Sequence, residues 1–441
     1  MQWPALPATR AALLLSLLYQ FRDSQHLPPE ALEARQFLQL AGLLKHAFET
    51  SPFYRERLAA AGYQPGATVD AALLARIPIL SRGDVRQAGA ALHASQLPAG
   101  HGAPTAVESA GSTGTPVRVL VTSLTQLLWE AFTLREHEWH RRELGARLAV
   151  IRYAPELPAQ GKPAPNWGPP ASWLYRTGPS ASLHIVTPVE RQAAWLLEQQ
   201  PAYLLTHPTN ALALAEWFIE NGERLPSLKQ VRTISEAAPA SLREACERAW
   251  GASVADVYSS RETGYLALQC PESGLHHVQS EGVIVEVLRA DGTPCAPGEL
   301  GRVVATVLHN FACPLVRYDL GDLAEAGAAC ACGRTLPTLQ RIAGRVRNML
   351  VLPSGQRLWP SIAGREIARA VPVKQFQVIQ QSLEQIRVLL VVARPLAPAE
   401  EEKVASILRG ALGHPFRIAL EYCEAIPRSA SGKFEEFRSE V

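Results

Sequence analysis

The chain has 441 residues, of which 47% are hydrophobic and 19% are charged, and its net charge is +2. This length predicts two or three domains, because one hydrophobic core rarely extends beyond about 250–300 residues. The near-neutral charge gives no reason to expect nucleic acid or an anionic membrane as partner, and no run approaches the ~20 apolar residues of a membrane span. The seven cysteines are odd in number and unevenly spread, which favours a reducing compartment over a secreted disulfide framework.

Helical spacing runs over residues 1–64. The apolar run 11–18 superficially resembles a signal-peptide core, but it lacks a small-residue cleavage site and apolar residues continue beyond it. We therefore expect an amphipathic helix packed on the protein, and a cytoplasmic location. Ser51 and Pro52 are typical of a capped helix start, and this helix is expected to end near Gly62.

Strands and helices alternate in the middle of the chain, which predicts parallel α/β units. In such sheets, ligands collect at the carboxyl ends of the strands. The expected strands are 148–153, 183–186, 203–205, 231–234 and 254–258, and the expected helices are 124–142, 189–199, 209–221 and 239–250.

Antiparallel β structure is expected after residue 276, with strands 283–288 and 301–308 joined through a turn at Asp291 and Gly292. The last hundred residues predict a separate α+β domain with strands 376–379, 386–392 and 416–422 and a helix 398–412. The fold class is thus α/β: a large N-terminal α/β domain with parallel sheets plus a β-rich subdomain (1–344), and a small mobile α+β C-terminal domain (345–441).

The segment Ser109-Ala110-Gly111-Ser112-Thr113-Gly114-Thr115-Pro116 is rich in glycine and hydroxyl groups. Glycines let successive backbone N–H groups converge into an anion-binding nest, and hydroxyls add donors around a polyphosphate. An ordinary polar turn has the same composition. No Gly-Lys-Ser/Thr follows, so the segment is not a Walker A loop.

Further polar residues follow expected strands or stand near the C-terminus. Glu262, in a loop after a strand, is suited to phosphate-bound Mg²⁺, and Asp322 is suited to ribose hydroxyls. Lys433 follows a Ser-Gly turn in the C-terminal domain and could reach phosphate or carboxylate oxygens. Each has an ordinary alternative: an exposed acid in a surface loop, a solvated turn aspartate and a frayed basic tail.

The order of these motifs resembles the adenylate-forming (acyl-CoA synthetase) superfamily, specifically its phenylacetate–coenzyme A ligase-like branch, over nearly the whole chain. The matching motifs are Ser51–Leu58, Ile77–Leu80, Ser109–Pro116, Tyr258-x-x-x-Glu262, Gly274-Leu275-His276, Arg317-Tyr318-x-x-Gly321-Asp322, Cys330-x-Cys332-Gly333-Arg334, Gly344-Arg345 and Ser431-Gly432-Lys433.

The resemblance implies a role for each matching residue. The loop residues that would grip the ATP phosphates are Ser109, Gly111, Ser112, Thr113 and Gly114. Glu262 resembles the Mg²⁺ ligand, and Tyr258 resembles the residue beside the adenine. Glu236 stands where the family commonly has a Gly-Glu pair and is assigned to nucleotide binding.

The resemblance also assigns the ribose and the reacting groups. Asp322 resembles the ribose-binding aspartate, and Arg345 resembles a second ribose or phosphate contact near the hinge. Lys433 resembles the lysine that bridges the carboxylate substrate and the α-phosphate.

The implied enzyme is an AMP-forming acid–thiol ligase that converts a small carboxylic acid, by preference aromatic or arylacetic, to an acyl-adenylate and then a coenzyme A thioester. Its cofactors would be ATP, Mg²⁺ and coenzyme A, and it would be a monomer or homodimer. Two alternatives stay open. The acyl group passes instead to a carrier-protein thiol or an amine, or the acyl-AMP is released; or the chain is a degenerate binding homologue without catalysis.

Cys270 and His276 form one possible ligand pair for a metal, and Cys330 and Cys332 form a second. A Cys₃His set is a tetrahedral combination typical of structural zinc. His277 is an alternative to His276, and reduced cysteines without metal are an alternative to the site as a whole.

Overall fold

The computed structural model describes residues 9–108, 117–154, 156–239, 241–345, 349–358, 360, 362, 364–426 and 434–441. The chain divides into two compact units, Met1–Ile342 and Ala343–Val441. The boundary falls inside a strand, β14 (Thr338–Arg345), that begins in the first unit.

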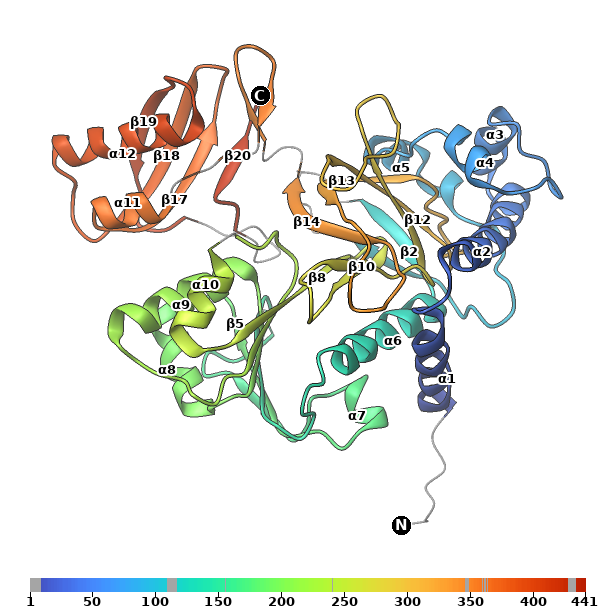
Figure 1. Cartoon of the computed structure of the whole chain (residues 1–441), viewed down its shortest axis with the longest axis horizontal. Coiled ribbons are helices and arrows are strands. Elements are labelled where there is room, and N and C mark those ends of the chain that lie inside the picture. Colours follow the sequence, from blue (N-terminus) through green and yellow to red (C-terminus); the bar gives the residue numbers. More distant parts are fainter. Residues whose placement is uncertain are drawn as a thin grey trace. The chain divides into compact units, whose positions relative to one another are not determined.

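Helices open the first unit (blue in Figure 1): α1 (Thr9–Ser24), α2 (Pro29–Thr50), α3 (Pro52–Ala60), α4 (Ala71–Arg76), α5 (Arg82–Ala88) and the 3₁₀ helix η1 (Gly89–Leu92). Ser51 begins α3 as expected, because its hydroxyl accepts from the Tyr54 amide at 3.4 Å and Pro52 occupies the first turn. At α5, Ser81 and Asp84 form a reciprocal capping box.

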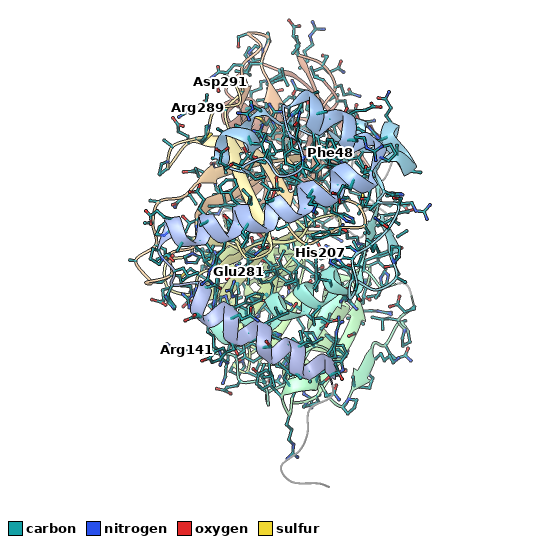
Figure 2. All side chains as sticks on the ribbon, turned by 90° about the vertical axis from the view of Figure 1, so that its right-hand side faces the viewer. Phe48, Arg141, His207, Glu281, Arg289 and Asp291 are labelled. Atoms are coloured by element: carbon teal, nitrogen blue, oxygen red, sulfur yellow. The ribbon has the colours of Figure 1, made fainter. Side chains whose placement is uncertain are left out.

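Helix α1 packs on the protein, as the sequence predicted. Its buried face meets α6 (Ser123–Trp139), where Phe21 stacks on Phe132 with 4.8 Å between ring centroids. Arg135 of α6 is buried beneath and donates to the Phe21 carbonyl oxygen at 2.8 Å and to Glu281 Oε2 at 2.9 Å (Glu281 is labelled in Figure 2). No helix in the described part of the chain is long and apolar enough to cross a membrane.

The predicted parallel α/β region is present. Strands β5 (Ser180–His184), β3 (Leu148–Arg152), β6 (Tyr203–Thr206), β7 (Gln230–Thr233) and β8 (Ser253–Ser260) lie in that order and run parallel. The connecting helices are α8 (Val189–Gln199), α9 (Pro208–Asn221) and α10 (Leu242–Trp250), which lie together in Figure 1. The short helix α7 (Ala171–Leu174) precedes β5, and β4 (Lys162–Ala164) adds an antiparallel edge.

An antiparallel region continues the same sheet beyond β8. Its strands are β9 (Gly264–Gln269), β10 (His276–Val278), β14, β13 (Tyr318–Ala326), β12 (Leu300–Val307) and β11 (Val283–Leu288), in that order. A separate hairpin of β1 (Thr105–Glu108) and β2 (Arg118–Val121) leads into and out of the 109–116 segment. Strand β8 is therefore where the parallel and antiparallel parts meet.

The second unit is a small α+β fold. Its sheet has the order β19 (Arg417–Tyr422), β18 (Gln385–Val392), β17 (Val373–Gln380) and β20 (Phe437–Ser439). The helices α11 (Gly364–Ala370) and α12 (Pro398–Leu412) join its core around Val378, Val388 and Leu408, and β15 (Leu350–Val351) pairs with β16 (Arg357–Leu358). The predicted strands and the helix of this region match the observed elements closely.

Candidate functional site

Glu262 lies in the tight turn 261–263 between β8 and β9, at the carboxyl end of the last parallel strand. Gly264 closes this turn with φ +81°, a conformation that side chains disfavour. The Ser260 hydroxyl accepts from the Thr263 amide at 3.1 Å and fixes the turn from inside. Although it is in a turn, Glu262 is only 7% exposed. The result is a carboxylate held inside the edge of the sheet where ligands collect.

An arginine already pairs with this carboxylate. Arg82, the first residue of α5, donates from Nη2 to Glu262 Oε1 at 3.1 Å, and the two side chains are 15% and 8% exposed. Sequence reasoning did not single out Arg82, because nothing near it in the chain marks a partner 180 positions away.

Tyr258 and Asp322 meet although they belong to separate strands. The Tyr258 hydroxyl donates to Asp322 Oδ2 at 2.9 Å. Strands β9, β10 and β14 lie between β8 and β13 in the sheet order, so the sheet curls to bring the two side chains together. The sequence-predicted adenine-side and ribose-side residues are thus neighbours.

Arg317 fixes the start of β13, five positions before Asp322. Its guanidinium donates to both oxygens of Glu286, at 3.0 and 2.9 Å, and to the carbonyl oxygens of Ala75 and Ile77 at 2.7 and 2.9 Å. Arg317 therefore ties the N-terminal helices to β11, which is separated from β13 by β12 in the sheet order, and it acts as a structural anchor for the site.

Glu236 lies just beyond the carboxyl end of β7, the strand that pairs in parallel with β8. Its Oε2 accepts from the Thr209 amide at 3.2 Å and from the Thr209 hydroxyl at 2.7 Å, and its Oε1 lies 3.3 Å from His207 Nδ1 (His207 is labelled in Figure 2). A carboxylate at the start of α9 is stabilised by the helix dipole. Glu236 therefore stands at the expected sheet edge with its carboxylate held by α9.

Several predicted site residues lie outside the described residues. They are the loop members Ser109, Gly111, Ser112, Thr113 and Gly114, and also Lys433. The side chain of Arg345, at the end of β14, is likewise outside the description. The roles of these residues stay predictions from the sequence.

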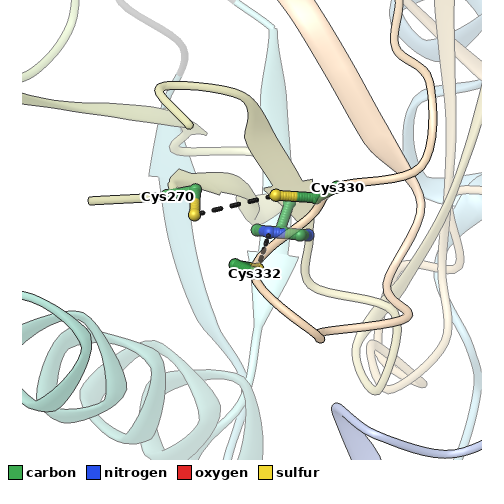
Figure 3. Close-up of side chains that lie close together, drawn as sticks. Cys270, Cys330 and Cys332 are labelled. Atoms are coloured by element: carbon green, nitrogen blue, oxygen red, sulfur yellow. Dashed lines mark hydrogen bonds between the residues drawn. The ribbon is translucent and has the colours of Figure 1, made fainter. Parts of the chain in front are cut away.

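A second cluster joins three cysteines and one histidine. The candidate ligand atoms of Cys270, His277, Cys330 and Cys332 all lie within 4.8 Å of one another (Figure 3). Cys330 Sγ is 3.9 Å from Cys270 Sγ, and Cys332 Sγ is 3.3 Å from His277 Nε2. The cluster joins the β9–β10 hairpin to the β13–β14 loop.

The histidine of this cluster is His277, so the prediction of His276 was wrong. Neighbouring residues of a strand point to opposite faces, and His276 Nε2 faces Asp256 Oδ2 at 3.3 Å instead. His277 Nδ1 donates to the Leu336 carbonyl oxygen at 3.2 Å, which leaves the Nε2 lone pair facing the sulfurs. Burial lowers the pKa of His277 to about 4, so its ring is neutral at pH 7.

Comparison with known proteins finds relatives that match three quarters of this chain or more. Residues 363–439 match the family described as CapK C-terminal domain. A phenylacetate–coenzyme A ligase of Thermus thermophilus is 25% identical over 95% of this chain and 98% of the relative. The Escherichia coli phenylacetate–coenzyme A ligase is 26% identical over 77% of each chain.

The fold is shared with solved ligases. A crystal structure of 2-hydroxyisobutyryl-CoA ligase with R3-HIB-AMP, in the postadenylation state, matches 95% of this chain and 91% of its own, with 19% identity and a TM-score of 0.72. The anthranilate CoA ligase AuaEII with anthranoyl-AMP matches 74% of this chain and 65% of its own, with 18% identity and a TM-score of 0.52. The chain therefore resembles the phenylacetate–coenzyme A ligase-like branch of the adenylate-forming superfamily, a branch of AMP-forming acid–thiol ligases, and it shares its fold with solved CoA ligases.

Proposed function

We propose that this protein activates an aromatic or arylacetic acid with ATP and transfers the acyl group to coenzyme A. A carboxylate oxygen attacks the α-phosphorus, the bond to pyrophosphate breaks, and a thiol sulfur then displaces AMP from the acyl carbon. The observation that carries the proposal is the hydrogen bond from the Tyr258 hydroxyl to Asp322 Oδ2, at 2.9 Å. It lies near the carboxyl end of β8, which Glu262 follows.

The nucleotide would lie along this edge of the sheet. Asp322 would accept hydrogen bonds from the ribose hydroxyls, with Tyr258 holding the carboxylate in place and flanking the adenine. Glu236 would border the adenine side, where Thr209 and His207 hold it. The 109–116 loop would bind the β- and γ-phosphates, and Arg345 would add a ribose or phosphate contact.

Glu262 fits the role of a Mg²⁺ ligand. It is a buried carboxylate at a strand end, and Mg²⁺ is commonly held by one or two carboxylates together with substrate phosphates. Its present partner is a cation, Arg82, and this pairing supports a role for the carboxylate in binding positive charge. Bound there, Mg²⁺ would offset the negative charge that builds up on the phosphoryl oxygens.

Lys433 would bridge the acid and the α-phosphate from the second unit, which we assign as the lid domain. Met1–Ile342 would be the adenylation domain. Movement of the lid after adenylation would withdraw Lys433 and admit the thiol, a form of domain closure known in other enzymes.

The acid and the acceptor are proposed from the relatives of this chain. The names of the relatives support phenylacetate-like acids and coenzyme A. The aromatic residues of the α6 region give the acid no extra support, because Phe132, Trp139 and Trp129 pack into the core between α1 and α6. A carrier-protein thiol or an amine remains the alternative acceptor.

We also propose that the Cys270, His277, Cys330 and Cys332 cluster binds a structural zinc ion. Three thiolate sulfurs and one imidazole nitrogen form a complete tetrahedral set. The hydrogen bond from His277 Nδ1 to Leu336 orients the ring as metal-binding histidines usually require. Four protein ligands leave no open position, so this ion would brace the sheet and take no part in the reaction.

Product analysis tests the proposal. Purified protein is incubated with Mg²⁺, ATP and a panel of aromatic, arylacetic and short hydroxy acids, with and without coenzyme A. We expect an aryl or arylacetyl thioester and AMP only when coenzyme A is present. Accumulation of acyl-AMP with coenzyme A present would favour another acceptor, and thioester formation only with aliphatic hydroxy acids would overturn the acid assignment.

A further inference from the structure

The carboxylate assigned to Mg²⁺ is already neutralised by the chain itself. The side chains of Glu262 and Arg82 are both largely buried, and Arg82 Nη2 lies 3.1 Å from Glu262 Oε1. A buried ion pair costs desolvation energy for both charges, so its presence in a ligand site calls for an explanation. Mg²⁺ bound at Glu262 would compete with the guanidinium for the negative charge of this carboxylate.

Backbone hydrogen bonds hold the segment before Arg82 against the start of β13, the strand that contains Asp322. The Leu80 amide donates to the Arg317 carbonyl oxygen at 2.8 Å, and the Asp319 amide donates to the Leu80 carbonyl oxygen at 2.9 Å. The Ser81–Asp84 capping box then starts α5. The backbone at Arg82 is therefore held in place relative to the strand of Asp322. Only the Arg82 side chain needs to move for the guanidinium to leave Glu262 and bind another group.

One donor of Arg82 is left over. Its Nε is buried and has no hydrogen-bond partner among the residues that the structure describes. A buried donor without a partner destabilises the folded protein, and such a group in a native structure calls for an explanation such as a ligand that it binds. Glu262 thus accepts a hydrogen bond from Arg82 Nη2 and leaves the Nε–H donor of the guanidinium without a partner among the described residues.

We propose that Arg82 is a phosphate-binding residue that exchanges its ion pair with Glu262 for phosphate oxygens of the nucleotide when Mg²⁺ and ATP bind. The inference rests on the proposed function. With Glu262 taken by the metal, the guanidinium is released beside the same anionic ligand. Its planar fork of N–H groups matches phosphate oxygens, which explains an arginine at this position.

Equilibrium binding of α,β-methylene-ATP, measured by calorimetry in saturating Mg²⁺, tests the exchange. Glu262→Gln is compared with the double variant Arg82→Gln/Glu262→Gln, because neither contains the ion pair. We expect the double variant to bind the analogue about tenfold more weakly, or worse, as expected for losing a hydrogen bond to a charged group. Equal affinity of the two variants would mean that Arg82 only neutralises Glu262, and would overturn the proposal.

Controls separate this result from misfolding and from failure of the proposed function. Arg86→Gln removes an exposed arginine from the same helix and should bind the analogue like the unmodified protein. Thermal unfolding without Mg²⁺ should show Arg82→Gln melting below the double variant, because it leaves a buried carboxylate unpaired; the reverse order would contradict the pairing. If the unmodified protein does not bind the analogue, both proposals fail, whereas normal binding with equal affinity of the two Glu262 variants removes only the Arg82 exchange.

Discussion

The hydroxyl of Tyr258 donates to a carboxylate oxygen of Asp322 across the curled sheet, at 2.9 Å. The two residues come from β8 and β13, which are separated in the sheet order by β14, β10 and β9. This contact joins the last parallel strand to the antiparallel region. It also holds the proposed ribose-binding carboxylate in one orientation.

Tyr258→Phe should raise the KM for ATP about three- to tenfold, because one hydrogen bond of about 1 kcal/mol no longer orients Asp322. Steady-state kinetics at saturating acid and coenzyme A measure the change. The matched control is Tyr265→Phe, which removes the buried contacts of the Tyr265 hydroxyl with Thr133 and Arg232. It should lower stability without changing this KM. An equal rise of KM in both variants would argue against a positioning role for Tyr258.

Gly264→Ala should disturb the Glu262 turn through its backbone alone. An added Cβ meets nothing within 4 Å, but φ is +81°, so we expect a loss of about 1–2 kcal/mol from the left-handed conformation. Gly292→Ala, in the β11–β12 turn with φ +85° and the same open surroundings, should cost a similar amount. Only Gly264→Ala should raise the Mg²⁺ concentration needed for half-maximal activity. A matching rise in Gly292→Ala would indicate a general effect of lower stability.

The metal proposal predicts different results for two adjacent histidines. Purified protein should contain about one equivalent of zinc, and His277→Ala should lose it because a tetrahedral ligand is missing. His276→Ala should keep the zinc, since His276 faces Asp256. Elemental analysis after gel filtration gives the ratio. Zinc retained by His277→Ala but lost from His276→Ala would reverse the assignment.

Glu136 is buried between two arginines. Its Oε1 lies 2.6 Å from Arg142 Nη2, and its Oε2 lies 2.5 Å from Arg232 Nη2. Burial alone would raise the pKa of Glu136, but the two arginines outweigh it and hold the pKa well below the usual 4.5. Because the folded-state pKa is the lower one, the stabilisation is complete above about pH 4.5 and is lost as the pH falls through the folded-state pKa.

Glu136→Gln should therefore destabilise the protein by about 3–5 kcal/mol at neutral pH, since it leaves two buried arginines without their charge partner. Below pH 4.5 its stability should fall less steeply than that of the unmodified protein. Urea unfolding across this pH range measures both effects. Glu143→Gln, which breaks an exposed pair with Lys229, should leave the stability nearly unchanged, because solvent screens this pair. Equal losses in the two variants would contradict the account.

The sequence predicted those features that depend on local chemistry. Ser51 and Pro52 begin α3 because capping and the fixed φ of proline act within one turn. The parallel strands were recognisable because each is a short apolar segment between helices, and the C-terminal α+β unit followed from the same patterns. The position of Glu262 in a turn after β8 also agrees with the prediction.

Features that depend on register or on long-range contacts were not accessible in this way. The choice between His276 and His277 is set by which face of β10 meets the cysteines, and the residue spacing is equally compatible with both. The Arg82–Glu262 pair joins positions 180 residues apart. No local pattern marks Arg82, because arginine at the first turn of a helix is ordinary, and only the fold brings it to β8.

The central claim is that the chain forms an acyl-adenylate, and acid-dependent exchange between ATP and labelled pyrophosphate tests it most directly. We expect exchange with at least one aromatic or arylacetic acid, and none without acid. Lys433→Ala should reduce the exchange rate at least about 100-fold while the protein stays folded, because the charge on the reacting phosphate loses a preorganised cation. No exchange with any acid, or exchange that is undiminished in Lys433→Ala, would contradict the account.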